Sequence, residues 1–138
     1  MSEADTPLKA HPPVSPESVE YWEACAAGKL LLQRCRTCGN VQFYPRLLCT
    51  ACASDELEWL EASGSGVVKS FSIIRRAVSA AYEPDVPYVV ALIELAEGPT
   101  MMSNVVDCDP EAARIGLPVQ VRFEAISDAI SLPVFAPA

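Results

Sequence analysis

The chain has 138 residues, of which 51% are hydrophobic, and this length suits one domain that buries about 68–70% of the surface its unfolded chain would expose. Its 18 acidic and 10 basic residues give a formal net charge of −8, which argues against nucleic-acid binding because that affinity depends on Lys and Arg. No apolar run reaches the ~20 residues of a membrane-spanning helix, and the N-terminus lacks the basic-then-apolar pattern of a secretion signal, so we expect a cytoplasmic protein with no membrane partner.

The first elements in chain order are an arm and a helix. Residues 1–14 contain prolines and few apolar side chains, which predicts a mobile arm. A helix is predicted over residues 15–28, with Ser15 as its N-cap and Pro16 at its first position. Trp22 lies on this helix, and because tryptophan is enriched at interface hot spots, an exposed Trp22 could anchor a partner. Packing of Trp22 against the next segment of the chain is the competing role.

The strongest signal in the sequence is a pair of Cys-x-x-Cys motifs, formed by Cys35, Cys38, Cys49 and Cys52. Four thiolates at this spacing can surround one metal ion, and the ion would be structural because no position stays open for water or substrate. Short β-rich segments lie before, between and after the motifs, so residues 29–63 are predicted to form a zinc ribbon with one Zn²⁺ per chain. Iron suits the same sulfur cage and would make the protein a rubredoxin-like electron carrier, which is an alternative.

Residues suited to catalysis are sparse. Cys25 and Cys108 stand outside the two motifs, and a nucleophilic cysteine needs an activating base. The only histidine, His11, lies in the predicted arm. Because acid–base catalysis at neutral pH most often uses histidine, we assign no catalytic residue and expect the chain to be non-catalytic when alone.

The second half of the chain is predicted to be a β-barrel. Gly64 and Gly66 mark its start, and five β-rich segments follow, with a short helix between the third and the fourth. This order is that of a five-stranded OB-fold over residues 64–138, although the order alone also suits other small barrels, and the fold class is mainly β. The five expected strands cover residues 67–77, 88–97, 99–107, 119–127 and 132–135.

Taken together, the motifs resemble those of the acyl-CoA-associated zinc-ribbon and OB-fold proteins, and the resemblance covers about residues 16–138. Members of that family combine an N-terminal helix, a rubredoxin-like zinc ribbon and an OB-fold. They act beside thiolase-like or MaoC-like catalytic subunits, some of them in lipid or steroid metabolism. The resemblance therefore implies an accessory, scaffolding subunit of a hetero-oligomeric thiolase, thiolase-like aldolase or acyltransferase complex that handles acyl-CoA. Besides Trp22, the segments that carry the resemblance are 28–30, 33–39, 43–46, 49–52, 64–68, 87–91, 116–119 and 133–135.

Two features of the predicted barrel are candidate contacts for such partners. Residues 77–87 are apolar for a surface loop, and OB-folds use this loop for recognition, which makes Tyr82 a candidate partner contact. The equally suited alternative is that the loop folds over one end of the barrel. Arg75 and Arg76 are the densest positive charge in the barrel half, so they are candidate contacts for the phosphates of coenzyme A, with a solvated strand end as the alternative.

A nucleic-acid-binding module remains the alternative from a different functional class, because zinc ribbons and OB-folds both have that use. This alternative predicts binding to single-stranded nucleic acid with an affinity that falls steeply as the salt concentration rises. The net charge of −8 opposes it.

Overall fold

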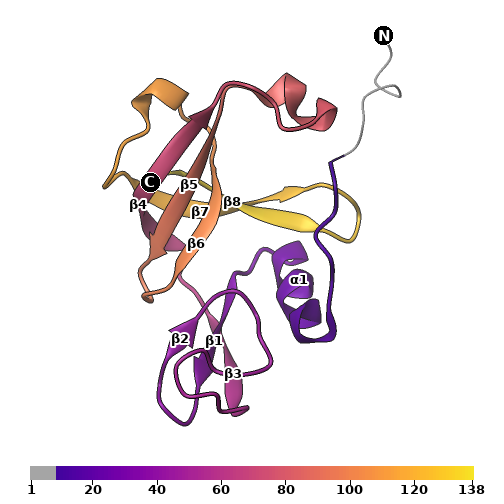
Figure 1. Ribbon diagram of the computed structural model, residues 1–138, viewed down its shortest axis with the longest axis vertical. Coiled ribbons are helices and arrows are strands. Elements are labelled where there is room, and N and C mark those ends of the chain that lie inside the picture. The colour runs from indigo at the N-terminus through magenta and orange to yellow at the C-terminus, as the bar shows by residue number, and fades with distance from the viewer. Residues whose placement is uncertain (1–8) are drawn as a thin grey trace.

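The computed structural model describes residues 9–138, so residues 1–8 of the predicted arm lie outside the described residues. Figure 1 shows a small three-stranded sheet at one end of the molecule, a closed barrel at the other, and the N-terminal helix α1 beside their junction. The prediction of a mainly β protein with an N-terminal helix, a zinc-ribbon region and a five-stranded barrel is confirmed.

The N-terminal helical segment begins as predicted. A 3-10 turn, η2 (Pro16–Ser18), leads into α1 (Val19–Ala26), and the Ser15 N–H donates to Ser18 Oγ at 3.0 Å. The helix ends before Gly28, which has a φ of +81°, a backbone conformation that glycine adopts at little cost. In the described part of the chain, no helix has both the length and the apolar character needed to cross a membrane.

The three-stranded sheet forms the ribbon and has the antiparallel order β2-β1-β3. Its central strand, β1 (Leu31–Cys35), pairs on one side with β3 (Leu57–Glu61) and on the other with the short β2 (Val41–Gln42). The register places Cys35 opposite Leu57. The first cysteine motif therefore begins where the central strand of the ribbon ends.

The barrel has the strand order β4-β5-β6-β8-β7 and is closed by pairing of β7 with β4. Neighbouring strands are antiparallel except for β6 and β8. Each predicted strand overlaps an observed one, with ends that differ by a few residues. Two 3-10 turns, η3 (Ala80–Asp85) and η4 (Pro110–Ala112), lie in the connections after β4 and β6. The strands are β4 (Ser65–Ile74), β5 (Tyr88–Leu95), β6 (Thr100–Val105), β7 (Pro118–Ala125) and β8 (Ser131–Pro137).

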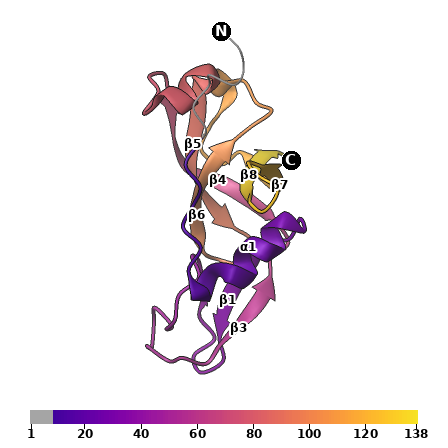
Figure 2. The same cartoon turned by 90° about the vertical axis from the view of Figure 1, so that its right-hand side faces the viewer.

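One continuous apolar core joins the ribbon, the helix and the barrel. Helix α1 contacts β1 of the ribbon and both β7 and β8 of the barrel, and Figure 2 shows it lying across the base of the barrel beside β1 and β3. Leu32 of the ribbon, Tyr21 of the helix and Phe135 of the barrel are each 1% exposed or less. Because these side chains belong to one packed cluster, the helix fixes the ribbon relative to the barrel.

The expectation that Trp22 is exposed on the helix is wrong. Its side chain is 6% exposed, because the indole packs edge-on against Tyr21 and donates its N–H to the Tyr44 hydroxyl at 2.8 Å. A buried indole N–H usually finds such a partner. The competing role, packing against the ribbon segment, is therefore the one that the structure shows.

Candidate functional site

The four sulfurs of the two cysteine motifs converge at the tip of the ribbon. The Sγ atoms of Cys35, Cys38, Cys49 and Cys52 all lie within 4.8 Å of one another. Two of the sulfur–sulfur distances, Cys35 to Cys52 and Cys38 to Cys49, are 3.6 Å. Sulfurs that surround Zn²⁺ tetrahedrally at about 2.3 Å lie about 3.8 Å from one another. The arrangement therefore fits a closed tetrathiolate zinc site.

The two motifs fold in the same way, although their sequences differ. In the first, the N–H of Gly39 donates to the carbonyl of Cys35 at 2.8 Å, and in the second, the N–H of Ala53 donates to the carbonyl of Cys49 at 2.9 Å. Gly39 and Ala53 both have a left-handed backbone, with φ values of +81° and +63°. Each motif therefore closes as a tight turn that directs its two sulfurs to a shared centre.

Backbone donors also favour the thiolate form that a metal requires. The N–H of Cys38 is the main reason that the pKa of the Cys35 thiol is lowered to about 6, and the N–H of Thr37 adds to the effect. In the second motif, the N–H of Ala51 donates to the sulfur of Cys49 at 3.3 Å. Because only deprotonated thiols ligate zinc, these donors favour the ligating form of Cys35 and Cys49, whereas the pKa values of the Cys38 and Cys52 thiols are raised.

A pair of buried glutamines, which the sequence analysis missed, holds the second motif against the sheet. Gln42 Nε2 donates to Gln33 Oε1 at 3.0 Å across β2 and β1, and the N–H of Thr50 donates to Gln42 Oε1 at 2.8 Å. Gln33 binds both backbone groups of Arg46, at 2.8 and 2.9 Å. Both glutamines are 5% exposed, so this network positions the chain between the motifs from inside the ribbon.

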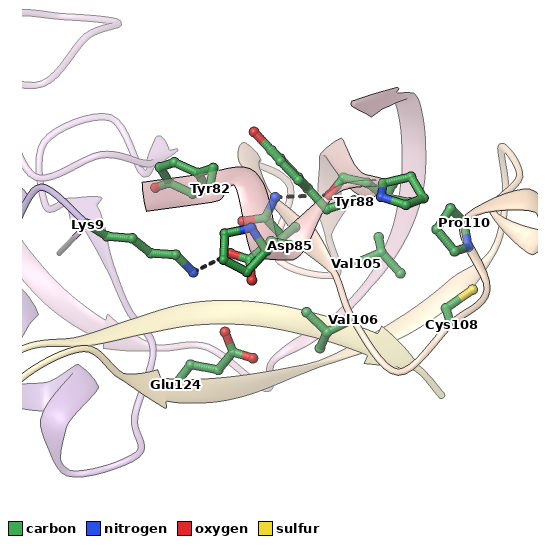
Figure 3. Close-up of a pocket in the computed structure, with 13 residues that line it drawn as sticks. Lys9, Tyr82, Asp85, Tyr88, Val105, Val106, Cys108, Pro110 and Glu124 are labelled. Carbon is green, nitrogen blue, oxygen red and sulfur yellow. Dashed lines mark hydrogen bonds and ion pairs between the residues drawn. The ribbon is translucent and has the colours of Figure 1, made fainter. Parts of the chain in front are cut away.

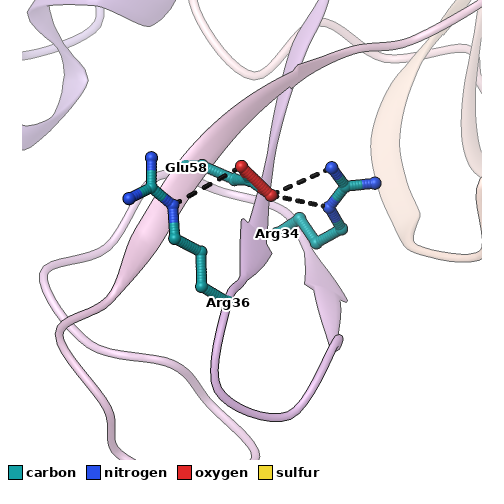
Figure 4. A network of polar contacts seen from close by, with 3 residues as sticks. All are labelled: Arg34, Arg36 and Glu58. Atoms are coloured by element: carbon teal, nitrogen blue, oxygen red, sulfur yellow. Dashed lines mark hydrogen bonds and ion pairs between the residues drawn. The ribbon is translucent and has the colours of Figure 1, made fainter.

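The arginines beside the first motif share one carboxylate. Arg34 and Arg36 flank Cys35, and both reach Glu58 of β3, with N–O distances of 2.9 and 3.5 Å (Figure 4). The hydrogen bond from Arg34 is the main reason that the pKa of Glu58 lies below its ordinary value. Two cations against one carboxylate leave a net positive charge, which can offset the charge of about −2 on a zinc tetrathiolate.

The two candidate coenzyme A contacts lie directly after β4 and differ in their surroundings. Arg75 and Arg76 are both exposed. Arg75 forms an ion pair with Glu111 of η4. Within residues 9–138 Arg76 has no ion pair. Arg76 is therefore the guanidinium more available to an anionic ligand.

Tyr82 lies in η3 beside a pocket of about 430 Å³ at one end of the barrel (Figure 3). Its ring lies 5.8 Å from that of Tyr88, and the ammonium of Lys9 lies 5.1 Å from the Tyr82 ring centre. Lys9 also pairs with Asp85 at 2.7 Å, and this contact is the main cause that raises the pKa of Lys9. Tyr82 is half-buried beside Tyr88 of β5, and its role as a partner contact stays a prediction.

The remaining thiols and the histidine do not form a reactive group. Cys25 is buried, and burial raises the pKa of its thiol to about 11, so it stays protonated at neutral pH. Cys108 is half-buried and donates to the carbonyl of Asp109 at 3.3 Å. His11 is exposed in the irregular segment before η2.

Comparisons with known proteins agree with this architecture. Residues 22–58 match the family model described as the ChsH2 rubredoxin-like zinc ribbon domain, and residues 59–124 match the model of the ChsH2 C-terminal OB-fold domain. A DUF35 domain-containing scaffold protein of Methanothermobacter thermautotrophicus is 38% identical over 96 residues, which cover 69% of this chain and 71% of that protein. The chain belongs to the DUF35 family of ChsH2-type zinc-ribbon and OB-fold proteins. The resemblance found in the sequence is thereby confirmed.

Two further relatives extend the comparison. A solved structure described as an Ltp2-ChsH2(DUF35) aldolase superposes with a TM-score of 0.82 at 33% identity, and the match covers 92% of this chain and 98% of that one. A probable enoyl-CoA hydratase alpha subunit of Thermomonospora curvata is 34% identical over 131 residues, which make up 95% of this chain. The matched region spans only 40% of that relative's length.

Proposed function

We propose that this chain is a non-catalytic accessory subunit that docks on the catalytic subunit of an acyl-CoA-processing complex and helps to hold the complex together. The observation that supports it most is the match of 92% of this chain to 98% of one chain in a structure described as an Ltp2-ChsH2(DUF35) aldolase. The candidate catalytic partners are a thiolase-like aldolase, a thiolase, an acyltransferase or a MaoC-like hydratase.

The proposed role of the metal is structural. Cys35, Cys38, Cys49 and Cys52 would hold one zinc ion, which would cross-link the two motifs and leave no open coordination position for a substrate. Metal analysis of the purified protein should give one zinc per chain and a colourless solution. A coloured protein with one iron per chain would instead support the electron-carrier alternative.

The proposal includes a direct contact between coenzyme A and the end of β4. Arg76, together with Arg75, would bind the phosphates, because guanidinium groups form strong charge-assisted hydrogen bonds with phosphate oxygens. Changing both arginines to Ala should weaken acyl-CoA binding by the assembled complex. An unchanged affinity would show that coenzyme A is bound elsewhere.

The experiment that tests the proposed function is the identification and reconstitution of the complex. The tagged chain should be purified from its own cells, its partners identified by mass spectrometry, and the candidate catalytic subunit then produced with it. We expect a stable complex of defined mass by light scattering. If the chain captures no acyl-CoA enzyme, the proposal is wrong, and salt-sensitive binding to single-stranded DNA would instead support the nucleic-acid alternative.

A further inference from the structure

We propose that the catalytic subunit docks on one charge-free surface, which we name the Met102 face; this inference rests on the proposed function. The face consists of three adjoining concavities of about 320, 290 and 170 Å³ that all include Met102 in their lining. Ser103 and Asn104 are shared by the first two concavities, and Val90 is shared by the first and the third. The three concavities therefore form one continuous surface.

The centre of the Met102 face is a patch of apolar side chains on adjacent strands. Met102 of β6 lies directly opposite Leu92 of β5, and Asn104 lies opposite Val90. Met102 is 69% exposed and Leu92 is 37% exposed. These positions would be polar on a strand face that only meets water, because polar and apolar residues alternate along a half-buried strand. Clustered exposed apolar side chains mark an interaction site more often than scattered ones do.

One side of the Met102 face is built by the helix and the ribbon. The concavity of about 290 Å³ lies where Trp22 of α1 and the segment after β2 meet β6 and β8. The hydrogen bond from Trp22 fixes the Tyr44 ring in this wall. Tyr44 lies two residues after Gln42, which binds the second cysteine motif through Thr50. The metal site and the Met102 face are therefore linked through a short stretch of chain.

The composition of the Met102 face is that of an interface core. None of its lining residues is charged, whereas Asp, Glu, Lys and Arg make up 20% of the chain. The lining includes all four tyrosines of the chain, one of its two tryptophans and two of its four phenylalanines. The cores of protein interfaces are depleted in charge and enriched in aromatic residues and methionine, and the face shows each of these features.

The neighbouring pocket of about 430 Å³ has the opposite character. It shares Tyr82, Tyr88 and Asn104 with the Met102 face, but its lining adds Lys9, Asp85 and Glu124. The ion pair between Lys9 and Asp85 lies within it (Figure 3). The neighbouring pocket therefore contains charged side chains, whereas the lining of the Met102 face contains none.

The net charge of the chain decides between the possible occupants. Two copies of a chain with a net charge of −8 would repel each other on approach, and a charge-free face offers no cation to relieve that repulsion. The concavities are close to or below the lower end of the ~300–1,000 Å³ typical of small-molecule sites. The occupant that fits is a heterologous protein with an apolar, uncharged surface, and we assign it to the catalytic subunit of the acyl-CoA complex.

The test uses Met102→Glu and a matched control, Ile115→Glu. Ile115 is 71% exposed and lies outside the Met102 face, in the turn before β7, so both variants place the same carboxylate at an equally exposed apolar position. The probe is the recombinant catalytic subunit that purifies with the wild-type chain and is identified by mass spectrometry. Calorimetric titration should give a Kd about 100-fold higher for Met102→Glu, because an unpaired carboxylate would be buried at the interface centre.

The Ile115→Glu control should change the Kd by less than about threefold, as exposed substitutions normally do. Unchanged thermal unfolding of Met102→Glu would show that the loss is not a folding defect. If wild type binds the catalytic subunit and Met102→Glu binds equally well, the docking surface is elsewhere and the proposed function stands. If no acyl-CoA enzyme binds the wild type, both proposals fail. Self-association of the purified chain that Met102→Glu abolishes would make the face a homodimer interface and overturn the assignment.

Discussion

The ribbon and the barrel of this small protein are stabilised in different ways. The ribbon has a three-stranded sheet with a two-residue edge strand, a buried pair of hydrogen-bonded glutamines and, at its tip, a cluster of four cysteine sulfurs. The barrel closes on itself around aliphatic side chains and Phe135. A short sheet buries little apolar surface, so the ribbon needs a cross-link that the barrel does not need. Metal removal should therefore destabilise the ribbon and leave the barrel folded.

The largest effect is expected from loss of a metal ligand. Cys49→Ser, or removal of the metal by a chelator, should unfold the ribbon, because structural zinc contributes about 10–16 kcal/mol of binding free energy in zinc-finger peptides. The barrel strands β4 to β8 should keep their protection from amide hydrogen exchange. Amide hydrogen exchange followed by mass spectrometry can measure both regions at once. Equal loss of protection in the ribbon and the barrel would contradict the proposed difference.

The opposite experiment removes a core side chain from the barrel. The Phe135 ring is 0% exposed, so Phe135→Ala should lower the free energy of unfolding by about 3–5 kcal/mol. Urea denaturation measures this change, and metal analysis under native conditions should still find one zinc per chain. Loss of zinc from the folded variant would show that the metal site depends directly on the barrel core.

The glutamine network tests the interior of the ribbon. Gln42→Leu leaves the Thr50 N–H without its acceptor and removes one of the two donors to Gln33 Oε1, which keeps the Arg46 N–H, so the free energy of unfolding should fall by about 1–3 kcal/mol. Gln120→Leu is the matched control, because the Gln120 side chain makes two hydrogen bonds of 3.0 Å at an exposed site. This substitution should lower the free energy of unfolding by less than about 1 kcal/mol. Equal losses in the two variants by urea denaturation would mean that burial of the network is unimportant.

The two cysteine turns give the smallest expected effects. At Gly39 an added Cβ would meet no atom within 4 Å, so Gly39→Ala should cost only about 1 kcal/mol, from the left-handed backbone. Ala53 already has that backbone. Ala53→Gly should therefore leave the free energy of unfolding within about 0.5 kcal/mol of the wild-type value or raise it, because relief of backbone strain offsets the added entropy of the unfolded chain. Thermal unfolding of the zinc-bound protein measures both. A larger loss for Ala53→Gly than for Gly39→Ala would contradict the similarity of the turns.

The sequence allowed good prediction of features that depend on local spacing. The two Cys-x-x-Cys motifs identified the four clustered sulfurs, and runs of β-formers between turn residues located all five strands of the barrel. Residues 57–61 form the third strand of the ribbon, where a β-rich segment after the second motif was expected.

Features that depend on tertiary contacts could not be predicted. Gln33 and Gln42 are polar residues within strands, and only the pairing of β1 with β2 reveals that their side chains meet inside the ribbon. The burial of Trp22 depends on Tyr44, which follows the first cysteine motif in the sequence and contacts the helix only in the folded chain. The Met102 face is likewise assembled from the helix, the ribbon and the barrel, so no single stretch of sequence shows that it lacks charge.

The central claim is that this chain contributes assembly, and that its catalytic partner contributes the chemistry. The most direct test is acyl-CoA turnover measured for the chain alone, for the identified catalytic subunit alone, and for the reconstituted complex at equal concentrations. The account predicts no turnover by the chain alone and a rate for the complex well above that of the catalytic subunit alone. Turnover by the chain alone, or an equal rate for the catalytic subunit without it, would contradict the claim.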